Sequence, residues 1–214
     1  MKELDYPFDS EYILKKRRSI KKQLLADGSQ RIKKNIAVLG GSTTNDILSM
    51  LELFLLNYGI EPSFYQSEFG QYWQDAMFGN PELDGFKPDF IFIHTTNRNI
   101  TEFNEGCMTA SAAETDEALE RQYSHFSRMW DNLFEKFHCP IIQNNMELPF
   151  YRLLGNKDSS DIHGKSNFIS RLNMKFYEYA QTHENFFIHD INYLSASYGI
   201  EKWSQPFYWY MYKY

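Results

Sequence analysis

A serine follows a short apolar run and two glycines in the segment Gly40-Gly41-Ser42-Thr43-Thr44. Glycines let the backbone bend sharply and leave N–H groups pointing outward at the start of a helix, where they stabilise negative charge. A hydroxyl at such a turn is placed as the nucleophile of acyl transfer would be, with donors close to the developing oxyanion. The pattern makes Ser42 a candidate nucleophile, with the Gly70 N–H and the Asn97 amide as further oxyanion donors.

A serine nucleophile needs a general base, and histidine serves most often. His94 and His189 each follow directly on an apolar run, so both are candidates from neighbouring strand ends. Asp161 and His163 lie in a polar segment at 155–164 that reads as a loop away from these ends. A histidine at a strand end is also a common structural residue, so the identity of the base stays open.

Other polar residues follow the same apolar runs, and we expect ligand-binding roles for Gly41, Thr43, Thr44, Arg98, Asn144 and Asp190. Each has a structural alternative. The glycine turn fits a plain strand-to-helix connection or an anion-binding loop without covalent chemistry, and Arg98 fits either a solvated charge or a clamp for carboxylate or phosphate. The turn matches neither the dinucleotide fingerprint nor the Walker A pattern. His, Asp and Glu are not clustered at ligand spacing, so no metal site is predicted.

These residues follow five apolar runs that alternate with helix-length segments. Strands are expected at 36–39, 62–66, 90–93, from 140, and at 186–188, and helices at 45–59, 113–138 and from 166. The alternation predicts an α/β fold, a three-layer α/β/α sandwich with a five-stranded, mostly parallel, doubly wound sheet of the flavodoxin-like type. Ligands bind such sheets just beyond the carboxyl ends of the strands, where the candidate residues lie.

Composition supports a soluble globular domain. The 214 residues are 43% apolar and 23% charged, and no apolar run approaches the ~18 to 20 residues needed to cross a bilayer. Two cysteines are too few for a disulfide framework, which favours a reducing, cytoplasmic location. Six aromatic residues crowd the last eight positions: Phe207, Tyr208, Trp209, Tyr210, Tyr212 and Tyr214.

Charge divides the chain unevenly. Residues 1–35 carry ten Lys and Arg against five Asp and Glu, whereas residues 36–214 carry twelve against twenty-three. The basic residues fall in a helix expected to open at Asp9 or Ser10 and to end before Gly28. We interpret residues 1–31 as a basic helical extension whose charged face is solvated or docks on another surface. The acidic remainder of the chain would repel phosphates, which argues against binding of nucleic acid.

The segment from Gly40 to Thr44 resembles the first block of the SGNH (GDSL) hydrolases, with Gly41 where that family usually has Asp. Gly70 falls at the second block, and Thr95-Thr96-Asn97-Arg98 resembles the third block, Gly-x-Asn-Asp. The resemblance implies an SGNH-like fold with Ser42 as nucleophile. The fourth block, Asp-x-x-His, is missing, because no histidine follows His189.

A narrower resemblance joins Leu-Gly-Gly-Ser-Thr-Thr, Lys-Pro-Asp-Phe-Ile-Phe-Ile, and the segment from Asp190 to Trp203 with the closing aromatic residues. Together these are similar to the N-terminal region of FkbH-like proteins, in which an SGNH-like domain precedes a haloacid-dehalogenase (HAD, subfamily IIIC) phosphatase-like domain. The resemblance implies that residues 32–214 form the SGNH-like domain and that the chain is cut before the HAD domain. Mg²⁺ is expected only there, since the Asp-x-Asp-x-Thr/Val motif is lacking here; no cofactor is expected in this segment.

Two functions follow as hypotheses. In the first, the resemblance implies an accessory domain that assists transfer of a glyceryl or other acyl unit to an acyl carrier protein in polyketide or surface-polysaccharide biosynthesis. Its partners would be the carrier protein or the downstream HAD domain, and its ligand a small acyl or phosphorylated compound, with no nucleic acid and no membrane. In the second, the chain is an autonomous esterase or acyltransferase that uses Ser42.

Overall fold

The computed structural model describes residues 1–212. Among the C-terminal aromatic residues singled out above, Tyr214 lies outside the described residues, as do the side chains of Tyr208 and Tyr212.

Five parallel strands form one sheet in the order β2-β1-β3-β4-β5. Their bounds are β1 (Ile32–Gly40), β2 (Ile60–Gln66), β3 (Phe90–His94), β4 (Ile141–Asn144) and β5 (Phe186–His189). All four neighbouring pairs are parallel. This confirms the predicted α/β fold with a doubly wound sheet. The chain winds outward from β1 to β2 and then turns back to β3, so the order reverses between β1 and β3, and a crevice opens at their carboxyl ends.

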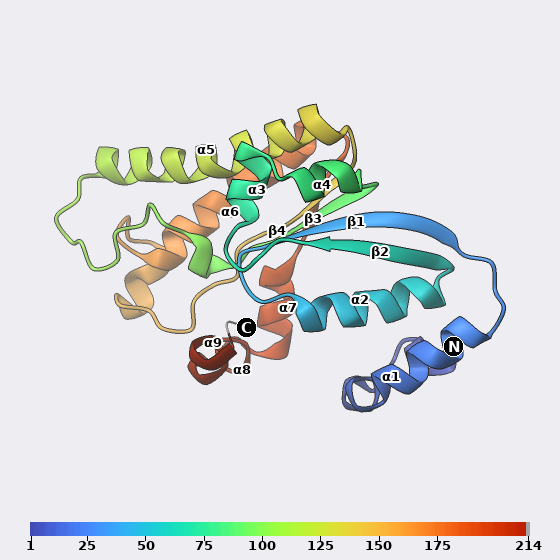
Figure 1. The fold of residues 1–214 in the computed structure, drawn as a ribbon. Coiled ribbons are helices and arrows are strands. Elements are labelled where there is room, and N and C mark those ends of the chain that lie inside the picture. Colours follow the sequence, from blue (N-terminus) through green and yellow to red (C-terminus); the bar gives the residue numbers. More distant parts are fainter. Residues whose placement is uncertain (213–214) are drawn as a thin grey trace.

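Helices connect the strands. The longer ones are α1 (Ser10–Ala26), α2 (Asn45–Asn57), α5 (Ala112–Phe137) and α6 (Lys165–Thr182). The shorter ones are α3 (Tyr72–Phe78), α4 (Pro81–Phe86), α7 (Ile191–Tyr198), α8 (Ile200–Trp203) and α9 (Pro206–Tyr212), with single 3₁₀ turns at η1 (Lys2–Leu4), η2 (Asn97–Asn99) and η3 (Gly155–Ser159). Figure 1 shows α3 to α6 over one face of the sheet and α2 and α7 over the other.

The predicted basic helix exists as α1, and the Asp9 side chain caps it by accepting a hydrogen bond from Tyr12 N–H at 3.0 Å. It packs on the outside of α2 through a small apolar cluster of its own, made mainly by Ile13, Ile20, Leu24, Leu53 and Leu56. Ion pairs from Arg17 to Asp46 and from Lys21 to Glu52 reinforce the contact. The extension is therefore attached to the body along α2 (Figure 1).

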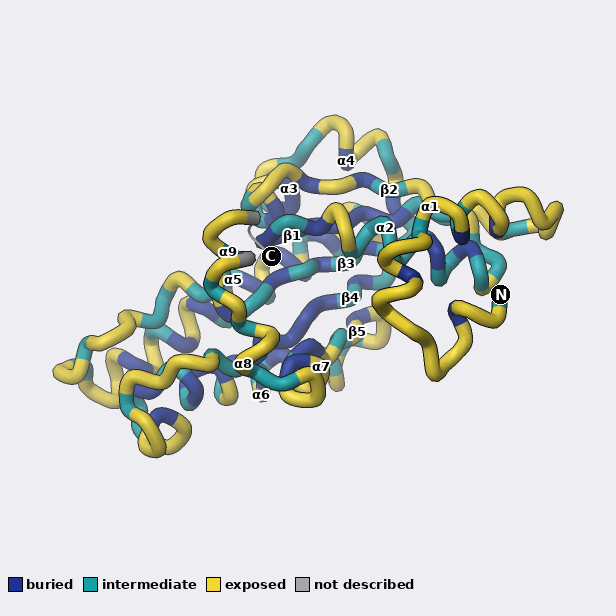
Figure 2. The backbone as a smooth tube through the Cα atoms, turned by 90° about the horizontal axis from the view of Figure 1, so that it is seen from below, coloured by how far each residue is buried: buried dark blue, intermediate teal, exposed yellow. Residues whose placement is uncertain are grey.

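Many of the aromatic residues form the core between the sheet, α5 and α6. Trp130 is fully buried, and the rings of Phe126, Phe176, Tyr179 and Phe186 surround it at 4.6 to 6.1 Å. Such rings bury large apolar areas and favour edge-on contacts. Figure 2 shows buried residues along the carboxyl half of β1 and along β3 and β4, whereas β2 is largely exposed or intermediate.

A buried polar chain ties this core to the strand ends. Trp130 Nε1–H donates to Gln143 Oε1 at 2.9 Å, and Gln143 Nε2–H donates to Thr95 Oγ1 at 2.8 Å. Because buried polar groups are costly unless they are paired, these bonds fix the ends of β3 and β4 relative to each other. The loops that follow both strands therefore begin from a rigid base.

Candidate functional site

A cavity of about 530 Å³ lies at the carboxyl end of the sheet, where β1 and β3 meet. Ser42 and Thr43 line it from the loop after β1, His94 from the end of β3, and Asn97 and Arg98 from η2. Five of the residues predicted from sequence therefore share one cavity. The winding of the sheet explains this, since the order reversal brings the loops after β1 and β3 together.

Ser42 and His94 face each other in this cavity. Ser42 Oγ lies 3.3 Å from His94 Nδ1, and the serine is only 5% exposed. The pKa of His94 is lowered to about 4, mainly because the ring is buried and also because His189 lies nearby. At neutral pH the ring is therefore uncharged and can accept the serine hydrogen, but such a low pKa makes it a weak general base.

The loop before Ser42 is packed too tightly for a side chain at position 41. A Cβ on Gly41 would lie 2.6 Å from Asn99 Cγ, closer than real Cβ contacts allow. Asn99 Nδ2–H donates to the Gly41 carbonyl at 3.1 Å, and Asn99 Oδ1 accepts from Thr96 N–H at 2.9 Å. Gly41 thus lets η2 dock on the loop that carries Ser42, and it stands outside the cavity wall. In this structure Gly41 positions the Ser42 loop against η2 and does not contact the cavity itself.

Asn97 is engaged by an acid that the sequence did not single out. Its Nδ2–H₂ group donates to Glu147 Oε1 at 2.9 Å and to the Glu147 carbonyl at 3.3 Å, and its backbone N–H donates to Glu147 Oε2 at 3.1 Å. An amide nitrogen carries only two hydrogens, so both are used here. In this arrangement the side chain does not offer an oxyanion a donor, and the predicted oxyanion role of Asn97 would require these bonds to break.

Glu147 is the most unusual ionisable group of the cavity wall. It follows β4 by three residues and is 4% exposed. Burial raises its pKa to about 7, against the lowering effects of its hydrogen bonds and of the cations Arg98 and Lys165. An isolated acid between Met146 and Leu148 has no spacing signal, and its place just after a strand end was the only clue in the sequence.

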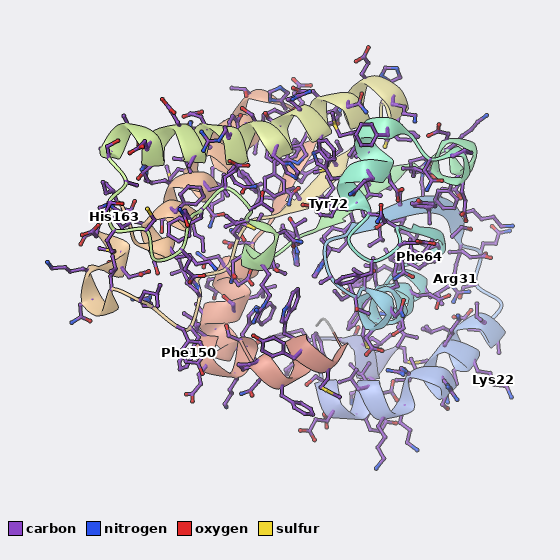
Figure 3. All side chains as sticks on the ribbon, turned by 60° about the vertical axis from the view of Figure 1, so that its left-hand side comes forward. Lys22, Arg31, Phe64, Tyr72, Phe150 and His163 are labelled. Atoms are coloured by element: carbon purple, nitrogen blue, oxygen red, sulfur yellow. The ribbon has the colours of Figure 1, made fainter. Side chains whose placement is uncertain are left out.

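The C-terminal helices form another wall of the cavity. Trp203 from α8 and Pro206, Trp209 and Tyr210 from α9 line it, together with Phe150, which Figure 3 labels. The guanidinium of Arg98 stacks on Trp209, with its Cζ 4.4 Å from the ring centre. The aromatic segment therefore packs against the cavity that contains Ser42.

The remaining predicted residues lie outside the described lining of this cavity. Gly70 follows β2 at a positive φ of 73°, which suits glycine, and it does not line the cavity. The buried Thr44 hydroxyl accepts a hydrogen bond from Gln66 Nε2–H at 2.8 Å, which ties the start of α2 to β2. The predicted functional roles of both residues stay predictions.

His189, Asn144 and Asp190 also have structural partners. His189 Nδ1 lies 2.8 Å from Asn144 Oδ1, and Asn144 Nδ2–H donates to the Thr95 carbonyl. Asp190 caps α7 by accepting from Tyr193 N–H at 3.0 Å. The ring of Phe92 lies 5.8 Å from both His94 and His189. Of the two candidate bases, only His94 contacts Ser42.

His163 belongs to a different part of the molecule (Figure 3). It bonds Asp161 Oδ1 at 2.7 Å and the Ala110 carbonyl at 2.9 Å, and it lines a second cavity beside Cys107. As expected from its loop, it plays no part at Ser42.

Within residues 1–212, no three His, Cys, Asp or Glu side chains lie close enough together to hold a metal ion. None of the described helices is long and apolar enough to cross a membrane.

A solved structure has a similar fold. The chain is similar to the N-terminal part of a Bacteroides fragilis protein that contains a phosphatase domain and is complexed with Mg, with a TM-score of 0.75 and 16% identity. The match covers 92% of this chain and 50% of that one, so this chain spans half the length of its structural relative. A Bacteroides fragilis protein proposed to be an acylhydrolase matches at a TM-score of 0.42 and 15% identity, over 85% and 77% of the two chains.

A search of curated proteins finds no match. A family model does match: the one described as the FkbH N-terminal domain aligns with residues 35–212, from the middle of β1 to the end of α9. That span includes every residue of the cavity wall described above, and it reaches the C-terminal helices α8 and α9. On this match the chain belongs to the family of FkbH N-terminal domains.

Proposed function

We propose that this domain holds a small acyl unit in the cavity beside Ser42 and assists its transfer to an acyl carrier protein. The observation that supports this is the Ser42–His94 contact inside a cavity whose described lining does not supply the rest of a hydrolytic site. His94 is a weak base, the hydrogens of the Asn97 amide are bonded to Glu147, and Gly70 is outside the cavity lining. These features support binding of an acyl unit in the cavity, and they do not support its rapid hydrolysis.

The cavity has the composition expected of a binding site. Sites for small molecules are concave and mostly apolar, with a few polar groups that fix orientation. Here Trp203, Trp209 and Phe150 supply the apolar surface, and Arg98 and Lys165 supply positive charge. We propose that the acyl donor is a phosphorylated glycolytic acid processed by a HAD phosphatase-like domain that needs Mg²⁺, and that the whole works in the cytoplasm, where the free thiols of Cys107 and Cys139 persist.

The test measures binding and hydrolysis together. The probes are a short glyceryl thioester, which mimics a carrier-bound acyl group, and p-nitrophenyl acetate. We expect saturable quenching of tryptophan fluorescence by the thioester, because Trp203 and Trp209 line the cavity, and no p-nitrophenol release above background. Binding should persist within about tenfold in Ser42→Ala, since one neutral hydrogen bond contributes about 0.5–1.5 kcal/mol. Absence of thioester binding would contradict the proposal.

One observation favours a second function. At 3.3 Å, Ser42 Oγ is placed to attack an acyl carbonyl while its proton passes to His94 Nδ1 and then to the leaving group. Esterase activity that disappears in both Ser42→Ala and His94→Gln would establish this alternative. Ser49→Ala is the matched control, because Ser49 lies on α2 outside the cavity lining and bonds only the Asp46 carbonyl in the described contacts.

A further inference from the structure

Glu147 lines the same cavity as two cations, Arg98 and Lys165. Arg98 reaches the cavity from η2 and Lys165 from the first residue of α6, and both lower the pKa of the Glu147 carboxyl through their charge. The hydrogen bonds from Asn97, the residue next to Arg98, hold that carboxyl in place. One buried acid and two cations from three segments of the chain therefore face a common space.

The other ionisable side chains that face this group are few. Glu105 lies 3.8 Å from Lys165 Nζ, His94 faces Ser42, and the phenols of Tyr151 and Tyr210 line the same cavity. With Glu147 ionised, the two cations meet two carboxylates. With Glu147 protonated, one positive charge is left without a compensating negative charge.

We propose that the cavity binds an anionic group, a carboxylate or a phosphate, together with a proton that Glu147 takes up. The inference rests on the proposed function and names the charge of the ligand that this function would handle. An anion that approaches Arg98 and Lys165 is repelled by an ionised Glu147 and accepted once that side chain is neutral. Asn97 keeps its hydrogen bonds in both states, because the oxygens of a protonated carboxyl still accept.

The linkage has a defined size and direction. With its pKa at about 7, Glu147 is mostly protonated at pH 6 and mostly ionised at pH 8. If the anion binds only the protonated form, its affinity falls about tenfold from pH 6 to pH 8, and about 0.9 proton is taken up per ligand at pH 8. The pKa of His94 is about 4, so this ring stays neutral throughout the window.

The experiment is isothermal titration calorimetry with glycerate and, separately, with inorganic sulfate, because both anions keep a constant charge from pH 6 to pH 8. Glycerate carries a carboxylate, and sulfate has the tetrahedral shape of a phosphate. The two titrations therefore show which of these anionic groups the cavity binds. Repeating each titration in buffers of different ionisation enthalpy counts the protons. We expect tighter binding at pH 6 and proton uptake at pH 8 for at least one anion.

Two variants test the assignment. Glu147→Gln should bind with an affinity that no longer depends on pH and without proton uptake, whereas Glu105→Gln, an exposed acid of the same wall, should keep the linkage of the wild type. If Glu147→Gln fails to fold, the number of protons that the wild type takes up per bound anion tests the inference by itself. Anion binding without proton uptake would overturn the inference. Binding of the glyceryl thioester with no anion binding would overturn it and leave the proposed function standing, and failure of all three ligands would overturn both.

Discussion

Replacing Glu147 with glutamine tests whether the fold keeps this acid neutral. The side chain is 4% exposed, and burial raises its pKa to about 7 from an ordinary value of 4.5. Glutamine has nearly the shape of a protonated glutamate but only one acceptor oxygen, so it loses one of the two hydrogen bonds that Asn97 donates to this carboxyl. That loss is the same at every pH, so the change of the difference with pH isolates the free energy of one ionisation.

The sign follows from the direction of the shift. A carboxyl whose pKa is raised on folding binds more protons in the folded state, so its contribution to stability is complete below pH 4.5 and is lost as the pH rises through 7. For a rise from 4.5 to about 7, the loss between pH 5 and pH 8 is about 2–3 kcal/mol. The stability of Glu147→Gln relative to the wild type should therefore rise by about 2–3 kcal/mol from pH 5 to pH 8, on top of a constant offset from the lost hydrogen bond.

The assay is urea unfolding followed by tryptophan fluorescence at unit steps from pH 5 to pH 9, for the wild type and the variant. The difference between their free energies of unfolding is the quantity to plot. Glu105→Gln serves as the control, because Glu105 is exposed on the same wall and solvent already reaches its charge. A difference between Glu147→Gln and the wild type that stays constant with pH would refute the reasoning, since the acid would then titrate alike in both states.

Two further predictions use the same unfolding assay. Gly41→Ala should lower the free energy of unfolding by about 1–3 kcal/mol, because its Cβ would collide with the Asn99 side chain. Gly85→Ala, which has open space within α4, should instead raise it by about 0.5–1 kcal/mol. His94 has its pKa lowered from 6.5 to about 4, so its contribution is present above pH 6.5 and declines as the pH falls toward 4. The wild type should lose about 2 kcal/mol relative to His94→Gln between pH 8 and pH 5, and an unchanged difference would contradict the buried, neutral assignment.

The sheet was predictable because buried parallel strands are continuous apolar runs. Ile91 and Ile93 are fully buried, and the run that contains them is the expected strand, now bounded as Phe90–His94. The strands extend beyond the apolar residues, however: β1 begins at Ile32, four residues before the predicted start, where its side chains are largely exposed. This part of β1 is a strand because it pairs with β2. The hydropathy of the sequence does not reveal backbone pairing, so the prediction began the strand too late.

The site was predictable only in part. Topology placed Ser42, His94 and Arg98 together, because the carboxyl ends of β1 and β3 must meet at the reversal of strand order. The hydrogen bonds of Asn97 were not predictable, since they depend on Glu147, which lies fifty residues farther along the chain. Nor was the stack of Trp209 on Arg98, because aromatic content says nothing about which cation a ring will cover.

The two buried ionisable groups of the cavity oppose each other in their effect on stability. As the pH rises from 5 to 8, Glu147 lowers the free energy of unfolding by about 2–3 kcal/mol while His94 raises it by about 2 kcal/mol. In the wild type the two slopes offset each other, and His125, His163 and His189 also have shifted pKa values, so the single variants are needed to reveal each slope. The same pair supports our proposal that the site holds an acyl unit without cleaving it rapidly. Near pH 7 a base with a pKa of about 4 draws a proton from Ser42 inefficiently, and in the proposed linkage Glu147 takes up a proton when an anion binds.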